Sequence, residues 1–461
     1  MKQVDFGSGK ISHCILTTAM PLLLAQVLNL LYNIVDRIYI ARIADVGTAA
    51  LGAVGIFFPM VSIISAFASL YGGGGSPLFA IERGKKDDEA ASLIMRLSFF
   101  MIVVTSVILM TVCLIFAPQI LRLLGASDAA MVYVLPYMRI YMCGTFFAMV
   151  AVGMNPFINA QGYPKMGMLT VLIGAAANII LDPLFIFVFG MGVTGAAIAT
   201  VISQCISAVF VLVFLCTKAQ LRLKMPRMAE IKGSFRTIGR IVSLGMASFV
   251  MLVSNSLVTI CCNQMLGRLG GDLYISVMTI MSSIRQIIEL PLTSFSDGTS
   301  PLISYNYGAG RMDRVRQSVA WLFGLGMLYA VLMWAAVMAF PGLFVSIFST
   351  DAELLADAAP AARIYFAAFF FMVFQHTGQT TFKALGRNRQ AIFFSVFRKI
   401  IIVIPLTLLL PTVFGMGTAG VFAAEPVSNV IGGMACFITM LLTVGKEFLP
   451  RKGAVRPENH G

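Results

Sequence analysis

The sequence contains few charged residues. Asp, Glu, Lys and Arg make up only 11% of its 461 residues, whereas soluble domains average about 25%. Soluble domains of this total length would need more charge to cover their surfaces, so the composition argues against a soluble enzyme or binding protein. Apolar residues make up 59% of the chain instead, which indicates a membrane protein.

Residues for metal binding, disulfide formation and catalysis are also scarce. The chain has three His residues, and its eight Cys residues lie in or beside apolar runs without the spacing of a zinc site. It contains no H-E-x-x-H or G-x-S-x-G motif, and the glycines at 72–75 lack the Gly-Lys-Ser/Thr of a phosphate-binding loop. We therefore expect no enzyme, no disulfide framework, no structural metal and no cofactor.

Twelve apolar stretches are long enough for transmembrane helices, which need about 20 residues each. Short polar or glycine-rich turns separate them. The pattern predicts an all-α polytopic membrane protein. The stretches cover residues 14–41, 46–81, 91–117, 130–157, 165–189, 194–217, 239–267, 273–304, 317–341, 360–384, 391–413 and 418–444.

Lys and Arg are distributed unevenly between the two sides of these predicted helices. Nearly all that lie in connections fall on the side of the two termini, and only Arg42, Arg122 and Arg268 fall opposite. Because positively charged loops stay in the cytoplasm, we expect a multi-pass protein of the bacterial cytoplasmic membrane with both termini inside. The net charge of +13 then reflects topology, and we expect no nucleic acid partner.

The two halves of the chain resemble each other at a shift of 224 residues, with one further residue of slip near the end of each half. Each half holds six predicted helices, so both halves have the same orientation in the membrane. The matches include 76–78 with 300–302, 139–141 with 363–365, Gly162 with Gly386, and 189–192 with 414–417.

This duplication predicts three parts of the chain. We expect an N-terminal six-helix lobe at 1–217, a basic cytoplasmic linker at 218–238, and a C-terminal lobe with a short cytoplasmic tail at 239–461. Repeated halves with a binding site between them are typical of transporters that work by alternating access.

Polar residues in the first predicted helix recur at steps of three and four, which places them on one helix face. Pro21 precedes this stripe and allows a kink, because it lacks a backbone donor. The stripe consists of Gln26, Asn29, Tyr32, Asn33 and Asp36.

Two acids inside the first half fall at one depth of the membrane. At 1.5 Å per residue, Asp36 and Asp182 each lie about 9–12 Å below the outer mouth of the predicted bundle. Asn178 shares a helix face with Asp182, and Thr200 is the next polar group along the chain. A charge at a helix centre costs about 2.5–3.5 kcal/mol, so such acids are either neutralised in packing or functional. Two close carboxylates are expected to share one proton. The pair favours a proton carrier, while sodium would suit the same oxygens.

The second half lacks this pair. Asp36 maps onto Ile260, and Asp182 maps onto Leu406 or Thr407, so we expect ion coupling in the first half alone.

The charges of the second half indicate a substrate cavity. Arg285 and Glu289 are four residues apart and are expected to pair as buried charges. Glu425 has no partner in the neighbouring sequence, so we expect it to attract a cationic substrate. The cavity candidates of both halves are Gln26, Asn29, Asn33, Arg285, Glu289, Gln375, His376 and Glu425.

These motifs resemble those of the multidrug and toxic compound extrusion (MATE) transporters over essentially the whole chain, and the second-half motifs resemble the MepA-like branch. The second-half motifs are Arg285 with Glu289, Pro301-Leu302-Ile303 before Tyr305-Asn306, and Glu425. The first-half motifs are Pro21, Tyr32-x3-Asp36, the N-x-x-x-x-A-x-G stretch from Asn155 to Gly162, Asn178-x3-Asp182-Pro183, and Thr200.

The resemblance implies a V-shaped molecule of two six-helix lobes that exports amphipathic organic cations in exchange for protons or sodium. It also implies that Pro21 is a hinge. Stretch 239–267 contains no acid, so a second-lobe cation site of the kind some relatives carry is not expected, which favours protons. The ion site that the resemblance implies consists of Asp36, Asp182, Asn178, Tyr32, Thr200 and Asn155.

Other functions remain open at this stage. A flippase for lipid-linked oligosaccharides has a similar architecture and would use basic residues facing the centre, such as Arg285 and Arg363. A channel or scaffold would tolerate neutral residues at Asp36 and Asp182. We expect a monomer whose partners are small organic cations and the lipid bilayer.

Overall fold

The structure is a computed structural model that describes residues 3–43, 47–348 and 351–445. These residues form helices and no strand. Ten helices are long and apolar enough to cross a membrane, and two bent helix pairs raise the number to twelve when each pair is one span. The all-α polytopic fold is confirmed, whereas the predicted cytoplasmic tail lies outside the described residues.

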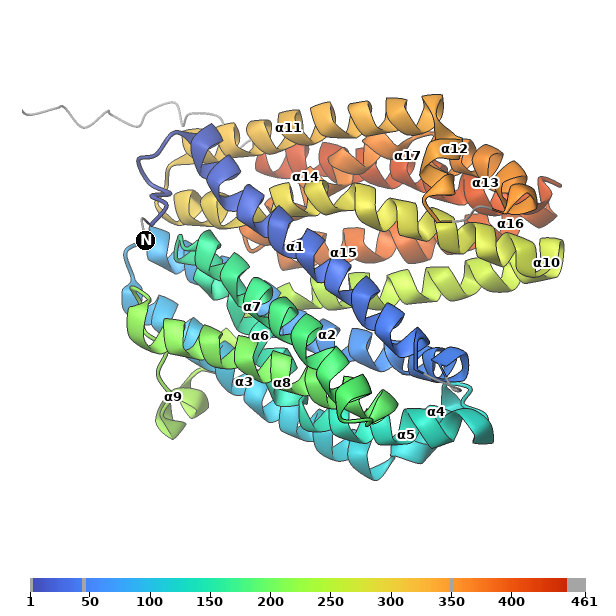
Figure 1. The fold of residues 1–461 in the computed structure, drawn as a ribbon. Helices are drawn as coiled ribbons and strands as arrows, with labels where there is room; N and C mark the ends of the chain where they lie inside the picture. The colour runs from blue at the N-terminus through green and yellow to red at the C-terminus, as the bar shows by residue number, and fades with distance from the viewer. Residues whose placement is uncertain (1–2, 44–46, 349–350, 446–461) are drawn as a thin grey trace, which may run out of the picture.

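The first half forms one lobe, coloured blue to green in Figure 1. Its helices are α1 (Ile11–Ala41), α2 (Gly47–Gly84), α3 (Asp88–Ile115), α4 (Ala117–Leu123), α5 (Asp128–Cys143), α6 (Thr145–Ala160), α7 (Pro164–Pro183) with the π-helix η1 (Leu184–Val188), and α8 (Gly192–Val213) with η2 (Phe214–Lys218).

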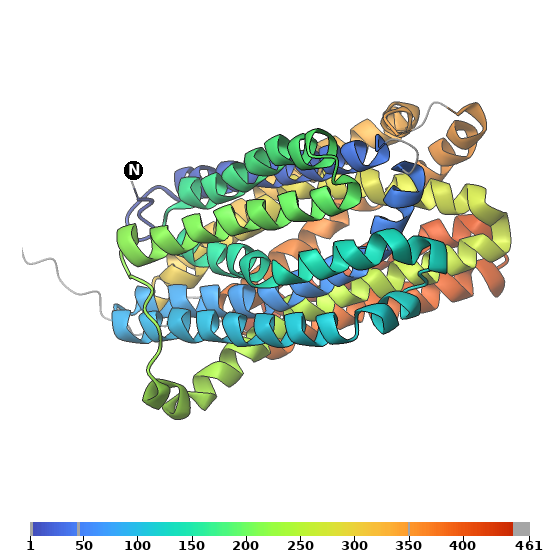
Figure 2. The same cartoon turned by 60° about the horizontal axis from the view of Figure 1, so that its bottom comes forward.

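The second half forms the other lobe, coloured yellow to red, and α1 runs across the seam between the two (Figure 1). The short helix α9 (Met228–Gly233) stands apart from the bundle (Figures 1 and 2). The remaining helices are α10 (Phe235–Gly308), α11 (Met312–Ala339), α12 (Pro341–Ser346), α13 (Ala352–Tyr365), η3 (Phe369–Phe371), α14 (Met372–Ala384), α15 (Asn388–Val396), η4 (Phe397–Val403), α16 (Ile404–Thr412) and α17 (Gly417–Val444).

Several helix ends follow from local sequence. The Asp87 side chain accepts a hydrogen bond from the Ala90 N–H and caps α3, and the Ser127 side chain caps α5 in the same way. Glycines at equivalent turns of the two halves share a left-handed backbone, which suits glycine because it has no Cβ. These pairs are Gly162 and Gly386, Gly190 and Gly415, and Gly192 and Gly417.

Two predicted spans are broken helices and not single ones. The stretch 130–157 consists of α5 and α6, which meet at an angle of 55°, and its repeat equivalent 360–384 bends by 42° between Tyr365 and Phe369. The prediction missed both bends because apolar length carries no information on direction. The predicted spans 239–267 and 273–304 form the two arms of α10, which meet at a kink at Gly271, where the backbone is not helical and φ is 68°.

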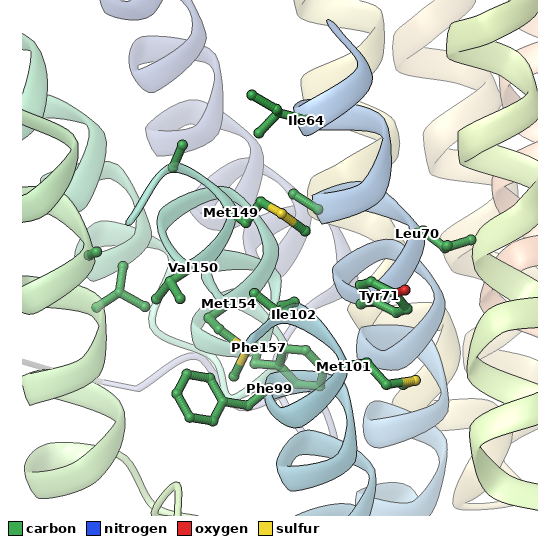
Figure 3. Packing of buried hydrophobic residues seen from close by; sticks show 14 of the residues in the cluster. Ile64, Leu70, Tyr71, Phe99, Met101, Ile102, Met149, Val150, Met154 and Phe157 are labelled. Atoms are coloured by element: carbon green, nitrogen blue, oxygen red, sulfur yellow. The ribbon is translucent and has the colours of Figure 1, made fainter. Parts of the chain in front are cut away.

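Each lobe has its own apolar core. In the first lobe, side chains of α2, α3 and α6 interlock around buried residues such as Tyr71, Ile102 and Phe157 (Figure 3). A separate cluster of buried apolar side chains, contributed by residues from Val258 to Phe422, forms a core of the second lobe. Many large apolar side chains stay exposed on the outside, as expected where lipid surrounds a protein.

The lobes touch through backbone at one end of the bundle. We call it the basic end, because it carries the connections at 85–87, 162–165, 219–227 and 385–388. A Cβ on Gly84 would lie 2.0 Å from the Tyr305 carbonyl oxygen, and one on Gly308 would lie 1.9 Å from that of Ile81. Only glycine permits this crossing. The central space between the lobes is therefore closed at the basic end.

Candidate functional site

A cavity of about 790 Å³ lies between the lobes and takes its lining from both. We call it the central cavity. It brings together ten residues that the sequence analysis proposed from separate helices. They are Gln26, Asn29, Tyr32, Asn33, Asn155, Asn178, Thr200, Glu289, Gln375 and His376.

The two acids of the first lobe lie side by side behind the cavity wall. Asp36 comes from α1 and Asp182 from α7, and their carboxyl groups are close enough to share a hydrogen bond. Asp182 is fully buried, and its Oδ1 accepts a hydrogen bond of 3.1 Å from the Asn178 amide. The same amide lies 3.5 Å from the Thr200 hydroxyl, which connects α7 to α8. The expected meeting of the two carboxyl groups is therefore present.

This acid pair includes side-chain oxygens that accept no hydrogen bond. Asp36 Oδ1, Asp182 Oδ2 and Asn178 Oδ1 are enclosed and accept no hydrogen bond within the described part of the chain. Facing carboxylates repel each other unless a proton or a cation lies between them. Among the described residues, no group of three or more His, Cys, Asp and Glu side chains is placed to hold a metal ion. The oxygens of the acid pair suit a proton or a small hard cation such as sodium.

The chain around Asp182 departs from a regular α-helix. Pro183 follows it immediately and lacks an N–H, and the π-helix Leu184–Val188 begins at the next residue. Short π-helical segments are frequent at functional sites because they rotate side chains out of the regular register. Asp182 thus lies at the junction between α7 and the π-helical segment.

Two tyrosines near the acids were missed by the sequence analysis. Tyr137 and Tyr141, one turn apart on α5, interact electrostatically with Asp36, as Tyr32 does. The Tyr141 hydroxyl accepts a hydrogen bond of 3.0 Å from Gln204. The i, i+4 spacing of the two rings indicates one helix face, but it does not indicate that this face lies toward Asp36.

The hydrogen bonds of Asn155 connect it to α7 and to its own helix, and its part in the ion site stays a prediction. Its amide nitrogen donates to the Gly167 carbonyl at 2.9 Å and to Thr170, and its oxygen accepts from Asn159 at 3.0 Å. These bonds join α6 to α7 near the basic end. Asn155 lines the central cavity, but its hydrogen bonds are not made with Asp36 or Asp182.

The second lobe carries a dense ion-pair network. Arg285 and Glu289 pair at 3.1 Å, as predicted. Glu289 also contacts His376 Nε2 at 3.2 Å, which places this histidine in the network and at the cavity wall. The Gln375 amide nitrogen, also at the cavity wall, donates to Gln379 Oε1 at 3.1 Å and to the Phe394 carbonyl.

Glu425 has no charged partner nearby in the sequence, but three basic side chains from other elements contact it. Its carboxylate accepts hydrogen bonds from Arg285, from Arg398 at 3.0 Å and from Lys399 at 3.2 Å. With 5% of its surface exposed, Glu425 is covered by cations and is not available to attract a cationic substrate. Arg398 and Lys399 stand within the apolar stretch 391–413, and the sequence analysis did not single them out.

Glu425 is therefore expected to stabilise the fold. Glu425→Gln would leave three neighbouring cations without this carboxylate, and breaking a buried ion pair costs about 3–5 kcal/mol. We expect a clear fall in the thermal unfolding temperature of the purified protein. Asp128→Asn is the control, since Asp128 pairs with Arg122 at an exposed site and should cost little. Equal melting of both variants would contradict this role.

Two further charged residues reach the central cavity. Asp297 on α10 and Lys383 on α14 both line it and interact electrostatically. At the cavity, α1 is also tied to α10, because the Thr293 hydroxyl donates to Gln26 Oε1 at 2.9 Å. Pro21 lies inside α1, which is a continuous helix, so its function as a hinge stays a prediction.

The fold and the site define a membrane transporter built from two repeated lobes, and the chain belongs to the MatE family. The sequence profile of this family matches residues 21–184 and 247–409. Members of the family are transporters and not enzymes, which agrees with the absence of catalytic motifs from the sequence.

Individual relatives resemble the chain over nearly its full length. The multidrug export protein MepA of Staphylococcus haemolyticus is 25% identical over 441 residues, which cover 95% of each chain. A solved outward-facing multidrug resistance MATE family transporter has a TM-score of 0.88 at 22% identity, covering 97% of this chain and 99% of that one. A Pyrococcus furiosus transporter, described as having a binding pocket of reverse polarity, has a TM-score of 0.89 at 21% identity, covering 98% and 100%.

Proposed function

We propose that the protein is a multidrug efflux antiporter of the bacterial cytoplasmic membrane, which exports amphipathic organic cations in exchange for protons by alternating access. The observation that carries this proposal is the pair of the half-buried Asp36 and the fully buried Asp182, which adjoins a cavity shared by both lobes. Family membership and the similarity to MepA support multidrug export.

The acid pair couples the ion to the substrate through competition. When the pair is deprotonated, its charge attracts a cation in the central cavity. A proton that binds between the two carboxyl groups removes this attraction and lets α1 repack against α7, with Pro21 as the point of bending. The substrate then leaves, and the lobes rock to the opposite opening.

The glycine crossing supports an order of states. Because Lys and Arg favour the cytoplasmic side, we place the basic end in the cytoplasm. Contact of the lobes at Gly84 and Gly308 then closes the cavity toward the cytoplasm, which corresponds to the state that releases substrate and accepts protons from outside. Separation at these glycines admits the next substrate.

The driving force is small and well defined. One proton exchanged for one monovalent cation moves no net charge, so only the pH difference contributes, by about 1.4 kcal/mol or tenfold per unit. A potential of 100 mV would add about 2.3 kcal/mol only if a second proton crossed.

Reconstituted vesicles test the proposal directly. With rhodamine 123 as the cationic probe, we expect vesicles with an acidic lumen to accumulate the dye, by up to about 100-fold at two pH units for one-for-one exchange. A sodium gradient at equal pH should not do so. Accumulation driven by sodium alone would replace the proton with sodium, and no accumulation under either gradient would refute antiport.

A flippase for lipid-linked oligosaccharides is the second candidate. It is favoured by the cations Lys383 and Arg398 at the wall of the central cavity, where an anionic pyrophosphate would be bound. The same vesicles distinguish the two functions, because a flippase would translocate the anionic lipid and leave rhodamine 123 undriven.

A further inference from the structure

A second, smaller cavity of about 220 Å³ lies within the second lobe, beside Arg398 and Glu425. We call it the second-lobe pocket. Met251, Glu289 and Arg398 line both this pocket and the central cavity, so the two adjoin. The proposed cation export assigns no function to the pocket.

The charges around the pocket do not balance. Three cations, Arg285, Arg398 and Lys399, surround two carboxylates, Glu289 and Glu425. Arg398 is 7% exposed and Lys399 is 5% exposed, so water screens this excess poorly. Burying an unpaired charge costs several kcal/mol. An anion in the pocket would remove that cost.

Donors without acceptors point to where an anion would bind. The side-chain hydrogen bonds of Arg398 to Glu425 and to Asn429 both start from Nη1, which leaves its Nε and Nη2 without an acceptor among the described residues. Arg285 uses Nε and Nη1 for its bonds to Glu289, Glu425 and Tyr365, so its Nη2 also has none. A guanidinium edge with two free N–H groups matches the two oxygens of a carboxylate.

The two lobes therefore differ in charge at equivalent positions of the repeat. Thr200 adjoins the acid pair in the first lobe, and its repeat equivalent Glu425 is surrounded by cations in the second. Tyr32 and Asn178, which interact with the acid pair, line the central cavity. Arg398 lines both the central cavity and the second-lobe pocket. A substrate with a positive and a negative group would match both walls.

We propose that the second-lobe pocket binds one anionic group, the carboxylate of a zwitterionic amphipathic substrate, against Arg398. This rests on the proposed efflux function and extends its substrates beyond simple cations. The carboxylate completes the charge balance of the pocket, while the cationic group of the same molecule lies in the central cavity.

A pair of dyes that differ in one group tests this assignment. Rhodamine 110 carries a free carboxylate, and rhodamine 123 is its methyl ester. We expect Arg398→Gln to raise the ratio of the Kd for the acid to the Kd for the ester by about tenfold, because a charged hydrogen bond contributes about 1.5–3 kcal/mol. The ratio is measured by fluorescence polarisation on the purified full-length protein.

The variants are chosen so that folding does not decide the result. Arg398→Gln leaves two cations facing two carboxylates, and Arg398→Lys should restore part of the ratio. Arg363→Gln is the control, since Arg363 lies exposed on α13. If Arg398→Gln does not fold, competition on the parent protein decides, because benzoate should displace the acid dye and spare the ester.

Three outcomes separate the possibilities. An unchanged ratio in Arg398→Gln, or benzoate that displaces both dyes equally, overturns the proposal. If exchanging isethionate for chloride changes the binding of both dyes equally in the parent and of neither dye in Arg398→Gln, the pocket holds free chloride and the carboxylate assignment is overturned. Failure of rhodamine 123 to respond to any ion gradient would instead refute the efflux function, whatever the ratio.

Discussion

Asp36→Asn is expected to abolish drug accumulation driven by a pH gradient and to leave a folded protein. Asn resembles the protonated acid in shape and charge, so the variant should stay in the state that holds substrate weakly. We expect a loss of about tenfold or more in affinity for a cationic dye, since 1.4 kcal/mol corresponds to tenfold. Folding should be retained, because a neutral residue inserts into a membrane more easily than a charged one.

The measurement is dye accumulation in vesicles under a pure pH gradient, with dye binding followed in parallel. Asp182→Asn tests the partner carboxyl group and should also lose coupling. Asp313→Asn is the matched control, because Asp313 is exposed in the first turn of α11 and away from the cavity. Accumulation by Asp36→Asn at the parent rate would exclude this residue from coupling.

Gly84→Ala is expected to hold the lobes apart at the basic end. The new Cβ would lie 2.0 Å from the Tyr305 carbonyl oxygen and 2.9 Å from the Ala309 nitrogen, both of which are backbone atoms that cannot turn aside. Alanine also favours a helix over glycine by about 1 kcal/mol, so α2 itself is not weakened. We expect turnover to fall at least about tenfold, because one of the two states of the cycle becomes inaccessible.

Spin labels at Lys85→Cys and Arg389→Cys report this opening, in a background where the exposed Cys143 and Cys216 are replaced by Ser. The distance between the labels should increase in Gly84→Ala. Gly324→Ala is the control, since a Cβ on this α11 glycine meets nothing within 4 Å. Unchanged label distances and turnover in Gly84→Ala would contradict closure by this crossing.

Much of the fold was predictable from apolar length, because a helix that crosses a membrane must satisfy its backbone internally and therefore leaves a long apolar run. The meeting of Asp36 with Asp182 was predictable too, since depth along a helix follows from residue number. The direction in which a helix continues after a bend was not predictable from the sequence. The bend at Gly144 depends on packing, where a Cβ would lie 2.7 Å from Val201 of α8, and no periodicity records such a contact.

The partners of Glu425 show where sequence reasoning on the site ends. Arg398 and Lys399 stand in the π-helix η4, and Arg285 comes from α10, so their convergence on one carboxylate depends on three separate elements. At spacings of three and four residues, the sequence around this site shows the Arg285–Glu289 pair but no charged partner for Glu425. A search for cations inside apolar stretches would have found Arg398 and Lys399, but not the carboxylate that they contact.

The glycine crossing has a consequence for the origin of the chain. Gly84 contacts Tyr305, and Gly308 contacts Ile81. Gly84 and Gly308 are equivalent in the repeat, and so are Ile81 and Tyr305, so each half contributes the same two positions to the contact. This reciprocity is the property of an isologous interface between two identical subunits. A symmetric dimer of single six-helix units would use the same surface on both copies. Fusion of two such genes through the connection at 219–234 would then require no new interface, only the later divergence that left acids in one lobe and a surplus of cations in the other.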